Sequence, residues 1–322
     1  MNLLSLPENP LPLGTRLHPL VTSGGVRLRA VSWLPEGPSR GTILILQGRA
    51  EMVEKYFELA DELRARGFAV ASFDWRGQGG SDRLAAHPLK GHVDALADYE
   101  ADLATVIEAV LLPFCPPPYH VLAHSTGGLV ILHRLARGRA PFQSAVLTAP
   151  LLDLGRLYPP SRLIGPLACA LTDARLGSAW PPGAVFLGSS VGGFKGNALT
   201  GDARRFARME AIRAARPDLA LGAPTIGWLA AVSRAMKEAA TPPFAAALDL
   251  PILLTCGSAD IVVASAVTLR FAARLARGRA VLIESARHEI LMEREEIRAI
   301  FWAAFDAFMT EVEAQESACA NA

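Results

Sequence analysis

Short apolar runs that alternate with helical patterns constrain the fold of this 322-residue chain more than any other feature. The runs GTILILQG (41–48), FAVASFD (68–74) and SAVLTAP (144–150) are apolar nearly throughout, which is typical of strands buried on both faces of a sheet. Stretches with helical spacing of apolar residues lie between such runs, at about 53–66 and 94–111. The alternation predicts an α/β fold, with a mostly parallel sheet and helices on both of its faces.

One long stretch interrupts this alternation. From about 151 to 244 the chain has three Pro-Pro pairs, scattered glycines and short helical pieces, without a run of the buried-strand type. Strand patterns resume at LPILLTCGSAD (250–260) and AVLIES (280–285), before a long final helix. We therefore expect a single domain in three parts: 1–150 as the first part of the core, 151–244 as a helical lid insert, and 245–322 as the second part of the core.

Composition excludes several classes of protein. A net charge of +1 with scattered arginines argues against nucleic acid as a partner. The first sixteen residues do not resemble a secretory signal, and no apolar run reaches the roughly 18–20 residues that span a bilayer. The four cysteines are far apart and no pair has metal-ligand spacing. We expect a cytoplasmic protein with reduced thiols, without a metal, a cofactor or a transmembrane segment.

Ser125 lies where a short strand meets a helix, in YHVLAHSTGGLV (119–130). This stretch resembles the nucleophile elbow, G-x-S-x-G, of the α/β-hydrolases, with small residues two before and two after the serine. Here those residues are Ala123 and Gly127, so alanine replaces the first glycine and keeps the position small. A serine at such a join can also be an ordinary turn residue, so the assignment depends on finding a base and an acid.

The elbow resemblance implies the order serine, acid, histidine along the chain. Of seven histidines, only His288 follows the insert, just after the strand pattern 280–285. Asp260 follows the preceding strand pattern and is the candidate acid, although a turn or helix-capping aspartate would also suit that loop. We expect Ser125, His288 and Asp260 to meet at the carboxyl edge of the sheet as a catalytic triad.

An oxyanion hole needs two backbone N–H groups near the serine. We expect one from Thr126, directly after the nucleophile, and one from Arg49, in the loop after the strand 41–48. Glu51 and Arg76 could brace that loop or form a surface ion pair.

Several motifs together resemble the lysophospholipase and monoacylglycerol lipase branch of the α/β-hydrolases, which is also described as serine aminopeptidase-like. The stretch 46–83 is similar to that family's H-G-x-x-E…D-x-R-G-H-G-x-S block, and AHSTGG (123–128), GSADIVV (257–263) and RHEILMEREEIR (287–298) match its nucleophile, acid and histidine blocks. GNALTGDARRFARMEAI (196–212) looks like the bacterial lysophospholipase variant. Gln47 and Gln78 replace two histidines of the family pattern, which puts the details of the loop geometry in question.

The resemblance implies a serine hydrolase that cleaves carboxylic esters of single-chain lipids through an acyl-enzyme. The apolar pieces of the insert would then cover the serine and hold the acyl chain, with Trp228 and Leu229 as substrate-binding residues and Ile164 and Leu167 nearby. Ordinary packing of these pieces onto the core is an equal alternative. Transient contact with a membrane surface fits a lipid substrate, and the oligomeric state is open.

Other functions remain compatible with this sequence. An aminopeptidase-like amide hydrolase would want an acidic ring in the insert, where acids are sparse. A short-chain esterase and an acyltransferase would use the same triad. A non-catalytic binding module would have no need of an intact triad, so an ester-hydrolysis assay separates it from the enzymes.

Overall fold

One sheet of eight strands organises the molecule, in a computed structural model that describes residues 2–138, 140–182 and 193–320. The strand order across the sheet is β1-β2-β4-β3-β5-β6-β7-β8. The bounds are β1 (Arg16–Val21), β2 (Arg27–Trp33), β3 (Thr42–Leu46), β4 (Ala69–Asp74), β5 (Tyr119–His124), β6 (Phe142–Thr148), β7 (Ile252–Gly257) and β8 (Gly278–Ile283).

The sheet is parallel except at one edge, which confirms the predicted fold class. β1 and β2 form a hairpin through the turn at Gly25, whose φ of 78° suits glycine, and β2 pairs antiparallel with β4. The pairs from β4 through β3, β5, β6 and β7 to β8 are all parallel. The parallel strands end at one edge, and loops from several strands meet there, as is usual for ligand sites in open α/β sheets.

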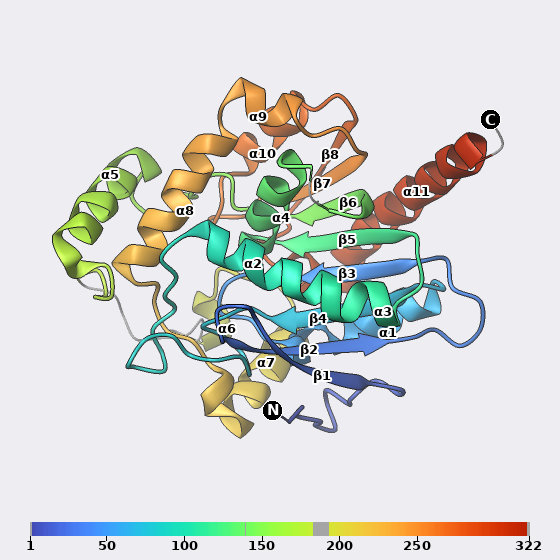
Figure 1. Cartoon of the computed structure of the whole chain (residues 1–322), viewed down its shortest axis with the longest axis horizontal. Helices are drawn as coiled ribbons and strands as arrows, with labels where there is room; N and C mark the ends of the chain where they lie inside the picture. Colours follow the sequence, from blue (N-terminus) through green and yellow to red (C-terminus); the bar gives the residue numbers. More distant parts are fainter. Residues whose placement is uncertain (1, 139, 183–192, 321–322) are drawn as a thin grey trace.

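Helices cover both faces of the sheet (Figure 1), and the buried side chains form a separate hydrophobic cluster on each face. One face packs against α2 (Leu96–Val106), α4 (Thr126–Ala136) and α10 (Ser265–Ala272). The other packs against α1 (Phe57–Ala65) and the long α11 (Glu295–Ala320). A 3₁₀ turn at Val53–Tyr56 precedes α1, and α2 continues through a π-helical turn at Ile107–Leu111 into α3 (Leu112–Phe114). These helices lie where the sequence predicts them.

The predicted insert is helical in its described residues and lies at the end of the sheet towards which the parallel strands run (Figure 1). Its helices are α5 (Ser161–Leu171), α6 (Gly193–Gly196), α7 (Ala203–Ala215), α8 (Ile226–Ala239) and α9 (Pro242–Ala246). A π-helical turn at Thr172–Leu176 ends α5, and a short 3₁₀ turn at Pro217–Leu219 follows α7. The division of the chain into core and lid stays a prediction, because position alone does not establish a lid.

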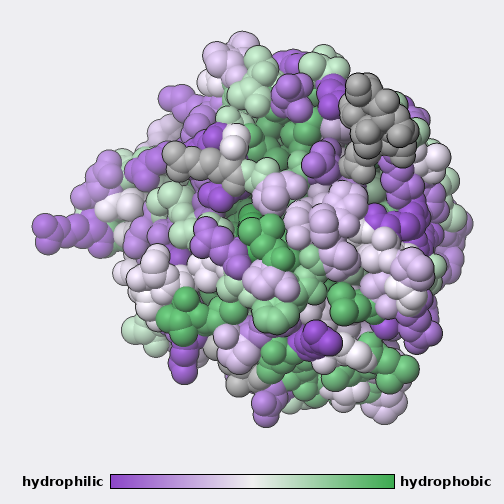
Figure 2. Space-filling model, turned by 45° about the vertical axis from the view of Figure 1, so that its right-hand side comes forward, coloured by the Kyte–Doolittle hydropathy of each residue, from purple (hydrophilic) through white to green (hydrophobic). Residues whose placement is uncertain are grey.

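Apolar side chains reach the surface in small patches. Figure 2 shows one face of the molecule on which hydrophobic and hydrophilic residues alternate over short distances. Leu163 and Leu167 of α5 are about three-fifths exposed, at 60% and 61%. Within the described ranges, none of the helices combines the length and the apolar character that crossing a bilayer requires.

Candidate active site

Ser125 occupies a strained turn between β5 and α4, as the elbow resemblance implies. Its backbone φ is 50° and ψ is −113°, a conformation that non-glycine residues adopt at a cost. A Cβ at Gly127 would lie 2.5 Å from the carbonyl oxygen of Leu46, which explains why only glycine fits two residues after the serine. Ala123 is fully buried in the preceding strand. The turn therefore requires small neighbours and holds the serine at the carboxyl edge of the sheet.

The structure brings together the three side chains that the sequence predicts as a triad. His288 Nε2 lies 3.1 Å from Ser125 Oγ, and His288 Nδ1 lies 2.8 Å from Asp260 Oδ2. The serine and histidine are nearly buried, and the carboxylate of Asp260 is fully so. Because a carboxylate only accepts hydrogen bonds when ionised, Nδ1 carries the proton and Nε2 is left to accept from the serine hydroxyl.

Asp260 is held in place as a charged group. Its Oδ1 accepts the backbone N–H groups of Val262 at 2.7 Å and Val263 at 3.1 Å, while Oδ2 faces His288. Burial raises the pKa of this carboxyl, but the hydrogen bond and charge of His288 and the two N–H groups outweigh it and keep the pKa below its ordinary value. The carboxylate can therefore both orient the imidazole and stabilise its protonated form.

The loop after β3 is braced from within, and Glu51 is part of the brace. Glu51 Oε2 accepts the N–H of Gly48 at 2.5 Å, and its carboxylate is buried. The alternative of a surface ion pair is therefore wrong for Glu51. Ala50 has a positive φ of 63°, so the chain turns sharply just after Arg49. These features constrain the backbone on both sides of Arg49.

Arg76 does not brace this loop. Its guanidinium instead pairs with Asp102 at 2.7 Å and Asp98 at 3.1 Å, both on α2. Gln78 contacts the loop in its place: Nε2 donates to Gly48 O at 2.9 Å, and Oε1 accepts the N–H of Ala50 at 3.2 Å. A glutamine has both a donor and an acceptor, so it can hold two points of the loop at once.

Gln47 does not make comparable contacts with the loop. Its Nε2 donates to Asp74 Oδ1 at 3.1 Å, and its buried Oε1 has no hydrogen-bond partner among the described residues. Both glutamines that depart from the family pattern thus contact residues around the loop after β3, which we call the oxyanion loop for the role predicted for Arg49, and the contacts of the triad are intact.

Thr126 begins α4, so its N–H is among the first in the helix, which lack partners within the helix. The helix N-terminus also places a partial positive charge beside Ser125. The oxyanion roles of Thr126 and Arg49 stay predictions.

A buried charged cluster that the sequence did not predict links the oxyanion loop to the histidine loop. Lys55 Nζ contacts Glu51 Oε1 at 2.5 Å and Glu289 Oε1 at 2.7 Å, and Glu289 directly follows His288. Burial raises the pKa of Glu51, but the charge of Lys55 and the hydrogen bonds from Lys55 and Tyr56 outweigh burial and lower the pKa to about 2. The i,i+4 spacing of Glu51 and Lys55 was the available sequence signal.

His124 lies between this cluster and the triad. Its ring is 4.8 Å from the ring of His288, centre to centre, and its Nε2 is 3.6 Å from Glu51 Oε1. Burial lowers the pKa of His124 to about 4, so the ring is neutral at physiological pH. A neutral His124 adds no positive charge beside the imidazole of His288.

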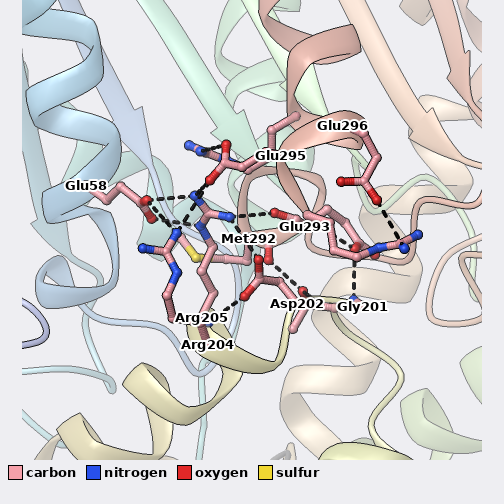
Figure 3. A network of polar contacts seen from close by, with 12 residues as sticks. Glu58, Gly201, Asp202, Arg204, Arg205, Met292, Glu293, Glu295 and Glu296 are labelled. Carbon is pink, nitrogen blue, oxygen red and sulfur yellow. Dashed lines mark hydrogen bonds and ion pairs between the residues drawn. The ribbon is translucent and has the colours of Figure 1, made fainter.

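The α7 segment of the insert is fastened to the core by polar contacts of the buried Arg205 and Glu293 (Figure 3). Arg205 of α7, whose side chain is only 1% exposed, pairs with Glu58 of α1 at 2.7 Å and with Asp202 and Glu295. Glu293 accepts the N–H of Gly201 at 2.8 Å through one oxygen and that of Arg287 at 2.9 Å through the other. Because Arg287 precedes His288, the α7 segment and the histidine loop share one anchor.

The predicted substrate residues of α8 lie close to the oxyanion loop. Trp228 is buried, its Nε1 donates to Tyr99 Oη at 3.2 Å, and the Arg49 guanidinium lies 5.3 Å from the centre of its ring. Leu229 and Ile164 are half-buried. Leu167 is mostly exposed, so packing onto the core does not account for it.

A groove of about 860 Å³ separates α5 and α8 from α10. Its apolar lining includes Leu152, Pro166, Met236 and Phe271, and several arginines surround it. Leu151, which precedes the lining residue Leu152, donates its N–H to Ser125 O at 3.0 Å, but Ser125, His288 and Trp228 are not among the lining residues.

Comparisons with known proteins agree with this geometry. The family model described as serine aminopeptidase, S33, matches residues 37–295. The chain is 31% identical over 265 residues to a probable lysophospholipase L2 of Haemophilus influenzae, covering 82% of each chain. It is 32% identical over 267 residues to lysophospholipase L2 of Escherichia coli K12, covering 80% of this chain and 77% of that one.

Solved structures share the fold at low sequence identity. A soluble variant of monoglyceride lipase from Saccharomyces cerevisiae aligns with a TM-score of 0.73 at 16% identity, covering 94% of this chain and 97% of that one. A thermostable carboxyl esterase from Bacillus coagulans aligns with a TM-score of 0.72 at 17% identity, covering 94% and 99%.

Proposed function

The chain belongs to the serine aminopeptidase S33 family of α/β-hydrolases, and we propose that it hydrolyses the carboxylic esters of single-chain lipids. The observation that carries the proposal is the continuous chain of contacts from Asp260 through His288 to Ser125, with distances of 2.8 and 3.1 Å. That arrangement suits acyl transfer to a serine.

In the proposed reaction, Ser125 Oγ forms a bond to the acyl carbon while His288 Nε2 accepts the hydroxyl proton. The carbonyl oxygen becomes an oxyanion that the N–H groups of Arg49 and Thr126 would stabilise. When the C–O bond to the alcohol breaks, His288 returns its proton to the departing oxygen. Water then attacks the acyl-enzyme by the same route, and the fatty acid leaves.

The substrate class follows from the relatives and from the insert. The relatives that align over 82% and 80% of this chain are named lysophospholipases, and shorter matches are named monoacylglycerol and monoglyceride lipases. We propose that Trp228 and Leu229 contact the acyl chain, since α8 lies beside the oxyanion loop. The apolar lining of the groove beside α5 and α8 suits a single alkyl chain.

The aminopeptidase alternative, which the family description raises, lacks the acidic ring that would bind a free amine. Most acids of the insert already lie beside an arginine or a histidine side chain. These contacts are Asp173–Arg234, Asp202–Arg205, Glu210–Arg213, Asp218–Arg216 and Glu238–His133.

A hydrolysis panel on the purified protein tests the proposal. It would compare lysophospholipids, monoacylglycerols, acetyl esters, diacyl lipids and amino-acid amides, with Ser125→Ala as the control. We expect the highest kcat/KM for the two single-chain lipid classes. A preference for acetyl esters would favour the short-chain esterase, and one for amides the peptidase. A cytoplasmic location, transient membrane contact and the oligomeric state lie outside this test, and the first two stay predictions.

A further inference from the structure

Arg49 has an unusual side chain for a residue at a catalytic edge. Its guanidinium is packed between the core and the insert, and its buried Nε has no hydrogen-bond partner in the part of the chain that the structure describes. None of the ion pairs among those residues includes Arg49. A cation removed from water is costly unless an anion compensates it. The side chain therefore has unused capacity to bind an anion.

The guanidinium is held in a fixed place. Its Nη2 donates to the carbonyl oxygen of Gly222, and its Cζ lies over the ring of Trp228. A Cβ at Gly91 would lie 2.8 Å from Nη2, so the backbone at Gly91 closes off a third side. Burial lowers the pKa of Arg49 to about 10, which still leaves it charged at physiological pH. An anion that reaches it meets a preorganised donor.

Arginines that are more deeply buried than the half-buried Arg49 have carboxylate partners. Arg29 lies between Glu54 and Asp74, at 2.7 and 2.6 Å, with all three side chains fully buried. Arg205 is likewise paired with Glu58. The titratable groups near Arg49 are instead the phenols of Tyr99 and Tyr158, and burial raises the pKa of both, so they are neutral at physiological pH. The contrast indicates that the partner of Arg49 is a ligand.

The position of the Arg49 side chain indicates which part of the ligand it contacts. The backbone N–H of the same residue is the proposed donor to the ester carbonyl oxygen. In a lysophospholipid, a short glycerol backbone separates the ester from the phosphate, and an arginine side chain spans a similar length. We propose that the Arg49 guanidinium binds the phosphate of the substrate's head group and so favours phosphate-bearing single-chain esters over neutral monoacylglycerols. This inference rests on the proposed function.

Planar guanidinium groups match phosphate oxygens with two parallel hydrogen bonds, and Nε is one of the donors that such a pair uses. A carboxylate has the same fork geometry, so the released fatty acid is a second source of an anion. Separate binding measurements with a phosphate ligand and a carboxylate ligand distinguish the two sources.

The test compares kcat/KM for dodecanoyl lysophosphatidylcholine with kcat/KM for monododecanoylglycerol, each below its critical micelle concentration. In Arg49→Met, we expect the ratio of the two to fall by about 10- to 100-fold, as for loss of a hydrogen-bonded charge. Arg49→Lys should lie between, because it keeps a charge but loses the fork. The ratio is the readout because Arg49 variants can also change the rate for both esters through the oxyanion loop.

Arg83→Met is the matched control. Arg83 also joins the core to the insert through carbonyl oxygens, donating to Asp218 O at 2.6 Å and Gly77 O at 2.8 Å. It is not part of the oxyanion loop, so the ratio should stay at the wild-type value. An equal fall in Arg83→Met and Arg49→Met would mean that both act by anchoring the insert, which would overturn the proposal.

Binding to Ser125→Ala protein separates this inference from the proposed function. Calorimetry would give the Kd of dodecylphosphocholine and of dodecanoate, with and without Arg49→Met. We expect weaker binding of dodecylphosphocholine in the Arg49 variant. Weakening of dodecanoate alone would assign the site to the product and contradict the proposal, as would no effect on either. If wild type hydrolyses neither ester, the proposed function fails, while this binding result still decides whether Arg49 holds a phosphate.

Discussion

The core edge and the insert differ in how their side chains are held. At the core edge, each group of the triad has its position determined by contacts within the fold, from the strained turn at Ser125 to the two N–H groups that hold Asp260. The insert is held in two ways: buried charges fasten α7, whereas α5 and α8 pack mainly through apolar contacts beside an open groove.

From this difference we infer that the core edge carries out the reaction and that the insert influences which substrates are preferred. Rigid groups at the core edge suit bond making, which needs fixed geometry. The α5–α8 region suits recognition of a flexible alkyl chain. If the comparison is right, changes at the core edge should lower turnover of every substrate, changes in α7 should lower stability, and changes in α8 should alter relative rates.

Ser125→Ala should have the largest effect. We expect kcat to fall by about 10⁴–10⁶-fold for all esters, because the nucleophile is lost while the oxyanion donors remain. The melting temperature should stay close to that of wild type. Retention of a tenth of the activity would mean that the nucleophile is another residue.

His288→Ala should cost nearly as much as Ser125→Ala, and the double variant should be hardly worse than either single one, since the two groups act as a unit. Asp260→Asn should cost about 10³–10⁴-fold, somewhat less, because other contacts still orient the imidazole in part. Steady-state kinetics of the three variants and the double variant would measure this. If the loss of kcat in the double variant equalled the product of the losses in the two single variants, His288 would not be the base.

Arg205→Met tests the charged anchor of α7. Removal of Arg205 leaves Asp202 without its basic partner and Glu58 mainly with Arg208, at 2.6 Å, so we expect the free energy of unfolding to fall by about 2 kcal/mol. Arg204→Met is the matched control, because the neighbouring Arg204 side chain is 70% exposed and its pairs contribute less than about 1 kcal/mol. Equal losses in urea denaturation would show that the buried anchor has no special role.

Buried His120 in the core should make the free energy of unfolding depend on pH. Burial, and to a lesser degree the charge of Arg40, lower the pKa of His120 in β5 from 6.5 to about 4. Between those values the unfolded chain binds a proton that the native state does not, so stability falls as the pH drops from 6.5 to 4, by up to about 3 kcal/mol for this group. His120→Gln should flatten that part of the profile in denaturant titrations. An unchanged slope would contradict the buried neutral state of His120.

The smallest effect concerns the acyl chain. Each methylene that the insert buries contributes about 0.8 kcal/mol, or roughly fourfold in kcat/KM, as long as the groove holds it. Along monoacyl esters of increasing length, Trp228→Ala should reduce this gain per carbon. An optimum at the shortest chains in wild type would contradict the lipid assignment and favour an esterase.

Much of this arrangement follows from the sequence. The apolar runs predict the strands of the sheet. Ser125, Asp260 and His288 each follow a predicted strand, so the shared carboxyl edge of the sheet brings them together. The cluster of Glu51, Lys55 and Glu289 was not predicted, because it joins residues from distant loops. For Arg76 the sequence left two roles open, a brace of the loop or an ion pair, and only the structure shows that it pairs with Asp102 of α2. Pairings between side chains on separate elements depend on tertiary packing.

The most direct test of the account is covalent labelling of the native protein with an alkyl phosphonate that carries a p-nitrophenyl leaving group, followed by peptide mass spectrometry. We predict one adduct, on the peptide that contains Ser125, which is absent in Ser125→Ala and forms much more slowly in His288→Ala. An adduct on a different residue of the wild-type protein, or equal labelling of Ser125→Ala, would contradict the assignment of Ser125 as the nucleophile.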